Sequence, residues 1–515
     1  MDGAELLLRT LVKGGVDTCF GNPGTSEMSF VAALDRVPDM RCVLGLFEGV
    51  VTGAADGYYR MADRPAATLL HLGPGLSNGS ANLHNARKAK SGVVNVIGQH
   101  ATTHMEFDSP LYADLDGLAA PVSDWVETAA HPDAVSAAAA TAIGVANGRP
   151  GKIASLLLPG DAAWGEASAP LASVPGRSVP QPTDADAIVA ARTALLSGEP
   201  TVLLVGGRAL SERALEIAGR IAAKTGCLLA TRFSYPRIER GAGRVPTFRI
   251  AYGVDQAVEQ LMAFRHLVCI QSPEPVGFFG YPGKPSLMKP DGCQVHSICD
   301  DEQDEIAVLE ALADAVGANS VTPTRQALHD RAVPMGALTP ETVANAIAQA
   351  LPEGAIVVDE SLTTGRQSYA LTAGAEPHDW LQNMGGSIGF GTPLAIGAAI
   401  ACPDRRVVCL AGDGSFMMTL QSLWTHARES LDITTVVFAN RTYQILKGEF
   451  ANVGAGIPGP TALSMLDIDN PTLDFLQLAG GMGIPSRRVD NAEDLWRRLT
   501  ESFRTPGPML IEVTL

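Results

Sequence analysis

The sequence predicts an α/β protein of three domains, each built on a parallel sheet that helices cover. Short apolar runs rich in β-branched residues alternate with longer helical stretches along all 515 residues, a pattern typical of parallel sheets buried on both faces. Two stretches rich in proline and polar residues, 168–184 and 318–340, interrupt this alternation and are expected to be linkers. The chain is too long for one core, so we expect domains at 1–170, 185–317 and 336–515.

Each domain is expected to contribute several strands whose carboxyl ends meet at one edge of its sheet. The expected strands are, in chain order, 42–47, 65–71, 92–98, 152–158, 200–205, 227–231, 266–271, 355–359, 406–411, 433–439 and 508–514. Open parallel sheets bind their ligands at that edge, where strands end and helices begin. Polar residues that directly follow a strand are therefore the first candidates for a functional site.

Composition and charge exclude several classes of protein. The net charge of −17 argues against a nucleic-acid-binding surface. No apolar run reaches the roughly 18–20 residues of a membrane span, and the N-terminus lacks the basic start and cleavage site of a signal peptide. The eight cysteines are scattered with no Cys-x-x-Cys pair, so neither a disulfide framework nor a zinc site is expected. We expect a cytoplasmic protein with reduced thiols and no nucleic-acid or membrane partner.

The strand expected at 406–411 ends in the residues GDGS, which place Asp413 between two glycines at the start of a helix. The glycines let the backbone approach a ligand closely, and amides at a helix start favour an anion. Asn440 ends the next strand, 27 residues later, so both side chains are expected at the same sheet edge. One carboxylate and one amide oxygen suit a Mg²⁺ ion that bridges to phosphate, although GDG alone also fits an ordinary turn.

A second carboxylate, Glu48, follows the apolar strand expected at 42–47 and precedes a helix of small residues. A carboxyl in this position is expected to be partly buried, which suits a group that shares a proton with a ligand. The residue equally fits a helix N-terminal acid that satisfies the amides of the first turn. The local sequence leaves these two roles open.

Together these motifs resemble the thiamine diphosphate (ThDP) enzymes related to benzoylformate decarboxylase and acetolactate synthase. The family's cofactor signature is Gly-Asp-Gly followed, some two dozen residues later, by Asn-Asn, and here Ala439 replaces the first Asn. The resemblance implies that Mg²⁺ and the cofactor's diphosphate are held by Gly412, Asp413, Gly414, Ser415, Asn440 and the carbonyl of Thr442. It also implies that Glu48, followed by the family's Ala-Asp-Gly-Tyr stretch at 55–58, hydrogen-bonds the cofactor's aminopyrimidine ring and activates it.

The resemblance extends over the whole chain and implies a pyrimidine-binding N-terminal domain, a middle domain and a diphosphate-binding C-terminal domain. The further site residues it implies are Thr25 and Gln99 near the substrate, Thr363 at the diphosphate, the carbonyl of Gly386 at the aminopyrimidine amine, and Ile388 beneath the bent cofactor. In the family the activating glutamate comes from one subunit and the metal site from its partner. A homodimer or homotetramer with active sites at subunit interfaces is therefore implied.

The implied substrate is a 2-oxo acid that loses CO₂. The product then takes up a proton, as in a decarboxylase, or joins a second carbonyl compound, as in a carboligase. His71 ends the strand expected at 65–71 and matches a catalytic histidine of benzoylformate decarboxylase, although it also fits a strand-end residue bonded to backbone. His100 and His104 are further candidates beside Gln99.

The sequence leaves the outcome of the reaction open. We expect carboligation, as in the acetolactate synthases of branched-chain amino acid biosynthesis, with simple decarboxylation to an aldehyde as the alternative. The middle-domain segment PEPVGFFGYPGKP lacks the second histidine of benzoylformate decarboxylase. That absence, together with Ala439, also allows a weakly active ThDP-binding homologue with a regulatory or partner role.

Acetolactate synthases of this family also bind FAD in the middle domain. The segment LLVGGRAL at 203–210 has a glycine turn without a phosphate-binding pattern around it. We therefore interpret its glycines as structural and regard FAD as doubtful. The same turn is the only support for a third alternative, an NAD-linked dehydrogenase.

Overall fold

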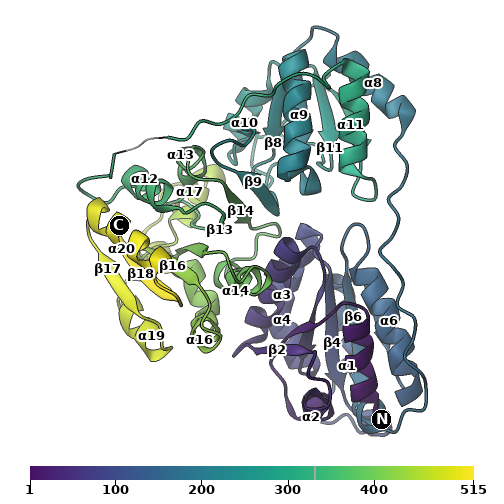
Figure 1. Cartoon of the computed structure of the whole chain (residues 1–515). Coiled ribbons are helices and arrows are strands. Elements are labelled where there is room, and N and C mark those ends of the chain that lie inside the picture. The colour runs from purple at the N-terminus through teal and green to yellow at the C-terminus, as the bar shows by residue number, and fades with distance from the viewer. Residues whose placement is uncertain (330–331) are drawn as a thin grey trace.

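The computed structural model describes residues 1–329 and 332–515. Within them the chain forms three β-sheets with helices packed on their faces, seen in Figure 1 as a purple N-terminal lobe, a teal middle lobe and a green-to-yellow C-terminal lobe. The predicted α/β architecture is confirmed. The stretch 168–184 runs as irregular chain between the first two lobes.

The N-terminal lobe holds a six-stranded parallel sheet in the order β2-β1-β3-β4-β6-β5. Its strands are β1 (Thr18–Gly21), β2 (Arg41–Leu44), β3 (Ala66–Leu70), β4 (Val93–Gln99), β5 (Trp125–Thr128) and β6 (Ile153–Pro159). Its helices are α1 (Gly3–Lys13), α2 (Met28–Leu34), α3 (Glu48–Ala62), α4 (Leu72–Ala89), α5 (Leu115–Ala119), α6 (Val135–Ala146) and α7 (Gly160–Trp164). The strand expected at 42–47 is shorter than predicted, because its neighbour β1 ends at Gly21, opposite Leu44.

The middle lobe holds a five-stranded parallel sheet in the order β10-β8-β7-β11-β12. Its strands are β7 (Thr201–Val205), β8 (Leu228–Thr231), β10 (Phe248–Arg249), β11 (His266–Ile270) and β12 (Gln294–Cys299). Its helices are α8 (Ala185–Leu195), α9 (Glu212–Thr225), α10 (Val254–Leu261) and α11 (Glu305–Val316). The chain crosses from β7 to β8 on one side and later to β11 on the other, which creates a switch point of the kind where open sheets bind ligands.

The C-terminal lobe holds a seven-stranded sheet in the order β17-β18-β16-β15-β13-β14-β9. Its strands are β9 (Arg237–Arg240), β13 (Ala355–Glu360), β14 (His378–Gln382), β15 (Val407–Gly412), β16 (Ile433–Ala439), β17 (Ser486–Val489) and β18 (Met509–Thr514). Its helices are α12 (Pro340–Ala350), α13 (Ser368–Leu371), α14 (Gly391–Ala401), α15 (Asp413–Phe416), α16 (Ser422–Arg428), α19 (Phe475–Gly481) and α20 (Ala492–Arg504). We keep the three-domain division as a proposal, with one addition: β9 lies within the proposed middle domain yet pairs antiparallel with β14.

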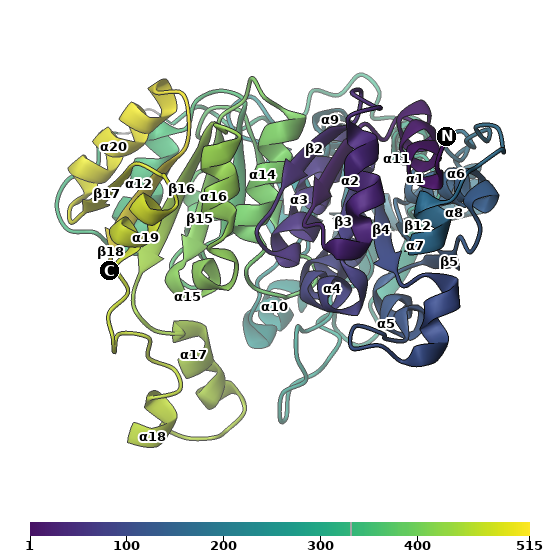
Figure 2. The same cartoon turned by 90° about the horizontal axis from the view of Figure 1, so that it is seen from below.

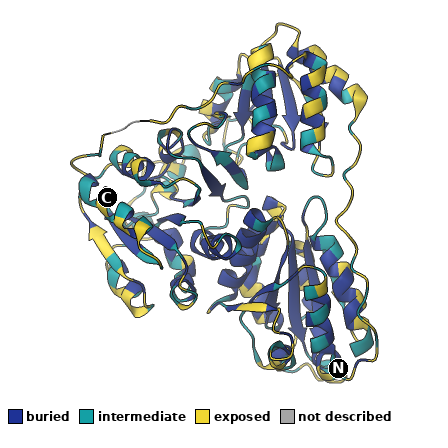
Figure 3. Ribbon diagram, in the orientation of Figure 1, coloured by how far each residue is buried: buried dark blue, intermediate teal, exposed yellow. Residues whose placement is uncertain are grey.

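Helices α3 and α14 join the N-terminal and C-terminal lobes by direct backbone contact (Figure 1). A Cβ at Gly57 would lie 2.1 Å from the carbonyl oxygen of Leu394, and one at Gly397 would lie 1.9 Å from that of Ala54. Only glycine allows so close an approach. Buried apolar residues continue from one lobe to the other through this contact, and Figure 3 shows the central strands buried and the outer helix faces exposed.

Two short helices project from the C-terminal lobe, as Figure 2 shows from below. They are α17 (Gln444–Asn452) and α18 (Pro460–Leu463), and they follow the strand that ends at Ala439. Among the described residues, no helix is both long and apolar enough to cross a membrane.

Candidate cofactor and active site

The glycine-aspartate motif lies at the carboxyl edge of the C-terminal sheet. β15 and β16 are parallel neighbours with Gly412 opposite Phe438, so Asp413 and Asn440 follow adjacent strands at one edge. Asp413 is 3% exposed. Its carboxylate accepts hydrogen bonds from the amides of Gly414 at 2.8 Å and Arg441 at 2.5 Å. These bonds tie the two loops together and leave further lone pairs of the carboxylate for a cation.

The electrostatics of Asp413 favour a positively charged partner. Burial raises the pKa of its carboxyl above the usual value of 3.8, although the amides of Arg441 and Gly414 act in the opposite direction. A cation held at this edge would stabilise the ionised form, which burial otherwise disfavours.

A tight turn follows β16 and presents two more oxygens. Arg441 has a φ of +58°, and the side-chain oxygen of Asn440 accepts a hydrogen bond from the amide of Thr442 at 3.1 Å. The Thr442 hydroxyl donates to Asp467 at 2.8 Å. The antiparallel bridge at this point uses the carbonyl of Arg441 and leaves that of Thr442 outside the ladder. An amide oxygen and a backbone carbonyl therefore lie in a restrained turn beside Asp413.

Ser415 gives the clearest sign that this edge accepts a ligand. Its hydroxyl is buried, with the residue 2% exposed, and has no hydrogen-bond partner among the described residues. Buried hydroxyls are normally satisfied, and this one lies at the carboxyl edge of the sheet, unlike the Ser422 and Thr435 hydroxyls, which also lack a partner among the described residues. Gly412 provides room, because a Cβ there would meet nothing closer than 3.9 Å. These oxygen groups with a single carboxylate fit Mg²⁺ and a diphosphate.

Other types of metal site find no support in the part of the chain that the structure describes. No group of three or more His, Cys, Asp or Glu residues is placed there to hold an ion.

Glu48 begins α3 and is buried. Its carboxylate accepts a hydrogen bond from Asn78 of α4 at 3.0 Å. The first-turn amides of Val50 and Val51 donate instead to the carbonyl of Phe47. Since the backbone already caps this helix, the Glu48 carboxylate is not needed there and is available to a ligand.

Helix α4 links the start of α3 to the glycine-rich segment ahead of α14. Asn82 donates to the carbonyl of Gly49 at 2.8 Å and reaches the carbonyl of Gly389 at 3.5 Å. Asn85 exchanges hydrogen bonds of 2.9 and 3.1 Å with the backbone of Ser387. The start of α3 and the segment expected to support the cofactor are therefore fixed relative to each other within one chain.

The remaining residues expected at the cofactor lie in loops of the C-terminal lobe. Gly386 has a φ of +82°, and a Cβ there would lie 2.8 Å from the ring of Phe278 in the middle lobe. Ile388 is half-buried two residues later. Thr363 lines a cavity of about 850 Å³ between the middle and C-terminal lobes, together with the aromatic ring of Tyr252.

Glu360 is a functional candidate that the sequence analysis missed. It ends β13 beside Ala411 of β15 and accepts hydrogen bonds from the amides of Gly389 at 2.6 Å and Gly391 at 2.7 Å. Burial raises the pKa of its carboxyl to about 7, although these amides act in the opposite direction. Glu360 therefore holds the start of α14 against the sheet edge that carries Asp413.

His71 belongs to a partly buried acid–base cluster at the carboxyl edge of the N-terminal sheet. Its Nδ1 lies 2.8 Å from the carboxylate of Glu27 and 3.2 Å from the hydroxyl of Ser26. Glu27 also accepts from the Gly24 amide at 2.7 Å and from the Ser26 hydroxyl at 2.9 Å. An ionised Glu27 requires a proton on Nδ1, which makes Nε2 the nitrogen that can exchange a proton with a ligand.

The other residues expected near the substrate differ in burial and in their contacts. Thr25 is exposed, and the neighbouring Ser26 provides the hydroxyl that bonds His71. Gln99 ends β4 in a buried position and accepts from the amide of His100 at 2.8 Å. The His100 ring contacts Ser109 at 3.2 Å, and the tilted ring of His104 lies beside it with ring centres 5.7 Å apart.

Some of the residues that the sequence analysis missed do carry a local signal in the sequence. Glu360 directly follows the apolar strand expected at 355–359, the same signal that identified Asp413. Asn78, Asn82 and Asn85 recur at helical spacing and so share one face of α4. Glu27 gave no such signal, because its pairing with His71 exists only in the folded chain.

Comparison with known proteins agrees with this geometry. Residues 1–120 match the thiamine pyrophosphate enzyme N-terminal TPP binding domain, and residues 364–513 match the corresponding C-terminal TPP binding domain. The two matched segments contain Glu48 and Asp413, the two ends of the candidate cofactor site.

Full-length relatives extend the match over the middle domain. The chain is 48% identical over 516 residues to a Mycobacterium tuberculosis protein named provisionally as acetolactate synthase large subunit IlvX, covering 100% of this chain and 99% of that one. It is 30% identical over 535 residues to benzoylformate decarboxylase of Pseudomonas aeruginosa, covering 98% and 97%. The solved 4-hydroxybenzoylformate decarboxylase of Rhodococcus jostii, a ThDP-dependent enzyme, superposes with a TM-score of 0.86 at 26% identity, covering 100% and 99%. The chain therefore belongs to the thiamine pyrophosphate enzyme family, among the relatives of acetolactate synthase and benzoylformate decarboxylase.

Proposed function

We propose that this chain is a ThDP- and Mg²⁺-dependent enzyme that decarboxylates a 2-oxo acid. The observation that carries the proposal is the edge formed by Asp413, Asn440, Thr442 and Ser415, where oxygen donors converge and a buried hydroxyl lacks a partner among the described residues. Asp413, Asn440 and the Thr442 carbonyl would hold Mg²⁺, and Ser415 would bind the diphosphate. Bound ThDP supplies the nucleophilic carbon for the bond cleavage.

Glu48 has the role of the activating carboxyl in this proposal. Its position at the start of α3 is fixed by the contact of α3 with α14, and Asn78 holds its carboxylate with a bond of 3.0 Å. A buried carboxyl can share a proton with a ring nitrogen more readily than a solvated one. The half-buried side chain of Ile388 would support the cofactor from the opposite lobe.

The cluster of His71, Glu27 and Ser26 favours proton transfer as the final step. Glu27 fixes the ring of His71 and leaves Nε2 to donate or accept a proton. A positioned acid is what a decarboxylase needs to release an aldehyde. We therefore place simple decarboxylation ahead of the carboligation expected from the sequence.

Carboligation remains the second candidate, supported by the full-length relative named for acetolactate synthase. The third candidate, a weakly active partner protein, loses part of its basis at Ala439. That side chain is buried in β16 with 1% exposure, and Asn440 follows it directly at the end of the strand. The substitution therefore falls in the core of the sheet and not at a proposed metal ligand.

Incubation of the protein with ThDP, Mg²⁺ and a panel of 2-oxo acids, with products identified by mass spectrometry, tests the proposal. We expect CO₂ release with an aldehyde product, and Glu48→Gln should abolish turnover. The exposed Glu106 is the matched control, and Glu106→Gln should keep full activity. Acetolactate from pyruvate would favour carboligation, and no cofactor-dependent turnover of any 2-oxo acid would contradict both.

A homodimer or homotetramer with active sites between subunits is part of the proposal. Mixing Glu48→Gln and Asp413→Ala chains distinguishes this arrangement from a site within one chain. If sites form between subunits, a mixed dimer regains one intact site and part of the activity. If each site is formed by one chain, the mixture stays inactive.

A further inference from the structure

The middle lobe contains a second cavity, of about 400 Å³, at the carboxyl ends of its strands and facing the N-terminal lobe. It lies at the switch point around β7, beside the glycine turn of residues 203–210, in the domain where acetolactate synthases bind FAD. A flavin dinucleotide would require free amides for its diphosphate, cations without partners, and space. Drug-sized ligands already occupy pockets of roughly 300–1,000 Å³, and FAD is larger than most of them.

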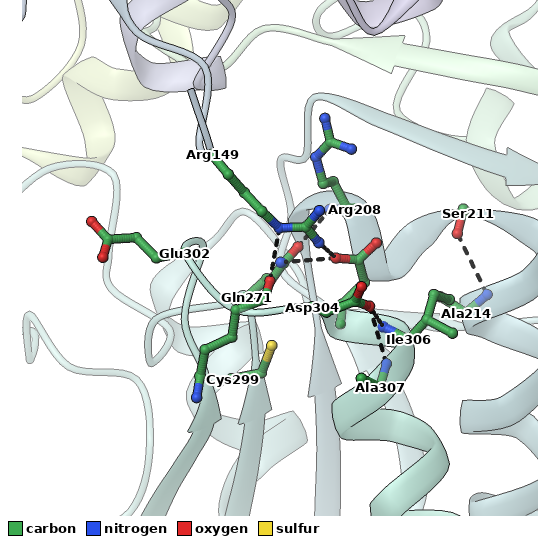
Figure 4. Close-up of polar contacts among 12 residues, drawn as sticks. Arg149, Arg208, Ser211, Ala214, Gln271, Cys299, Glu302, Asp304, Ile306 and Ala307 are labelled. Carbon is green, nitrogen blue, oxygen red and sulfur yellow. Dashed lines mark hydrogen bonds and ion pairs between the residues drawn. The ribbon is translucent and has the colours of Figure 1, made fainter. Parts of the chain in front are cut away.

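The glycine turn after β7 is covered by a side chain of the protein itself (Figure 4). The amide of Arg208 donates to the side-chain oxygen of Gln271 at 2.8 Å. A Cβ at Gly207 would lie 2.9 Å from that same oxygen, so Gln271 occupies the place where a phosphate would approach the turn. The amide group of Gln271 is bonded in turn to Glu305 at 3.3 Å, which fixes the side chain there.

The two helix starts beside the cavity are capped by acidic side chains. Asp304 accepts hydrogen bonds from the amides of Ile306 at 2.9 Å and Ala307 at 3.1 Å at the start of α11 (Figure 4). Glu239 accepts from the amide of Glu212 at 2.5 Å at the start of α9. Helix starts bind phosphates through these amides, so both candidate anion sites already hold a negative charge.

Three ion pairs at and beside this cavity join the N-terminal and middle lobes. Arg149 of the N-terminal lobe binds Glu305 of α11 with both side chains nearly buried, at 12% and 10% exposure. Two further pairs join the same lobes and link Lys90 to Asp301 and Asp63 to Arg208. A diphosphate would have to break these pairs and would face the released carboxylates.

Arg232 and Lys88 are the exceptions at this cavity. Arg232 follows β8 and is half-buried, Lys88 is exposed on α4, and neither has a hydrogen-bond or ion-pair partner within the described ranges. Two such cations can attract a phosphate group, but they do not supply the amides that a diphosphate-linked dinucleotide needs.

We propose that Gln271 and the ion pairs of this cavity replace FAD, so that the chain folds and binds ThDP without flavin and its own side chains join the N-terminal and middle lobes. The proposal is independent of the reaction proposed above, because flavin binding and unfolding are measured without turnover.

The flavin half of the proposal is tested on the full-length holoenzyme. We expect no visible flavin absorbance in protein purified with ThDP and Mg²⁺, no flavin released on acid precipitation, and no saturable quenching of FAD fluorescence on titration. One flavin per chain, or saturable quenching, would overturn it. Saturable binding of ADP at the cavity would also contradict it, because it would show that the internal contacts yield to a nucleotide diphosphate.

The ion-pair half is tested by thermal unfolding of the holoenzyme. Arg149→Met leaves the nearly buried Glu305 carboxylate without its charge partner, and we expect the unfolding temperature to fall by several degrees. Arg64→Met removes an exposed pair with Asp17 inside the N-terminal lobe and should change it little. Equal effects of the two variants would contradict the proposal. If Arg149→Met does not fold, the same comparison is made with Lys90→Met, whose partners are more exposed.

Discussion

Two sheets of this molecule end in a glycine turn that leads into a helix, and the two turns differ in whether their polar groups have partners. In the middle lobe, the turn amide of Arg208 is bonded to Gln271, and both neighbouring helix starts carry acidic caps. In the C-terminal lobe, the hydroxyl of Ser415 is buried without a partner among the described residues, and Gly412 leaves space beside it.

The comparison shows that the place where a sheet can bind a ligand and the presence of a ligand there must be argued separately. A parallel sheet predicts where a ligand can bind, because strand ends and helix starts converge there. Whether a ligand binds depends on which polar groups the protein leaves free at that edge. The Tyr235 hydroxyl at the middle cavity also lacks a partner among the described residues, but the turn amide and the helix starts there are already bonded to side chains. We therefore propose the C-terminal edge as a binding site and the middle edge as an interface between lobes.

The largest expected effect concerns the carboxyl edge of the C-terminal sheet, which we call the open edge because Ser415 lacks a partner there among the described residues. Asp413→Ala removes the single carboxylate of the proposed metal site. We expect ThDP affinity to fall by at least about 100-fold, since even outer-shell changes at metal sites cost roughly 10–100-fold. Calorimetric titration with ThDP measures the change. Asp404, exposed at the other end of β15, is the matched control, and equal binding by Asp404→Ala and Asp413→Ala would refute the assignment.

Glu27→Gln tests the acid–base cluster. We expect kcat to fall by roughly 10–100-fold with a smaller change in KM, because His71 loses the partner that orients its ring. Steady-state kinetics on the best substrate of the panel measures the split. A change confined to KM, or the same loss in Glu106→Gln, would remove His71 from the proton-transfer role.

Glu360→Gln tests the support behind the open edge. The variant places an amide group against the backbone amides of Gly389 and Gly391, and we expect a loss of roughly 2–3 kcal/mol in the free energy of unfolding. Burial raises the pKa of Glu360 to about 7 from 4.5, so its stabilising contribution is full below the unfolded value and is lost as pH rises through about 7.

Urea unfolding of the wild type and Glu360→Gln at about pH 5 and about pH 8 separates these contributions. The difference between the two proteins should be larger at the lower pH. A difference independent of pH would mean that Glu360 does not titrate in this range.

The smallest expected effect concerns the carboxyl edge of the middle sheet, which we call the closed edge because Gln271 and the ion pairs occupy it. Burial raises the pKa of Asp63, but hydrogen bonds and charge from Arg177 and Arg208 outweigh it and hold the pKa below the usual 3.8. Asp63 therefore contributes stability above about pH 4 that is lost as pH falls through its lower folded value. Because the pair is partly exposed, we expect Asp63→Asn to cost no more than about 1 kcal/mol at neutral pH.

Urea unfolding at about pH 7 and about pH 3 measures this effect, with Asp17→Asn as the control for an exposed pair inside one lobe. The account requires the Asp63→Asn difference to be smaller at the lower pH. A difference that is the same at both pH values would show that the ion pairs do not join the lobes electrostatically.

The sequence predicted the elements whose signals are local. Apolar runs located the principal strands, and the spacing of Asp413 and Asn440 predicted that they follow adjacent strands, as β15 and β16 do. β9 was missed because its residues RIER carry no apolar run and its partner β14 is about 140 positions away. Contacts such as Glu27 with His71 depend on loops that only the whole fold brings together.

The measurement that tests the central claim most directly is calorimetric titration of the full-length protein with ThDP and with FAD, each in the presence of Mg²⁺ and again with the metal chelated. We predict one ThDP bound per chain, binding that depends on Mg²⁺, and no heat of binding from FAD. ThDP binding that is absent, or that persists unchanged without Mg²⁺, would contradict the site at Asp413. FAD binding would contradict the closed middle edge.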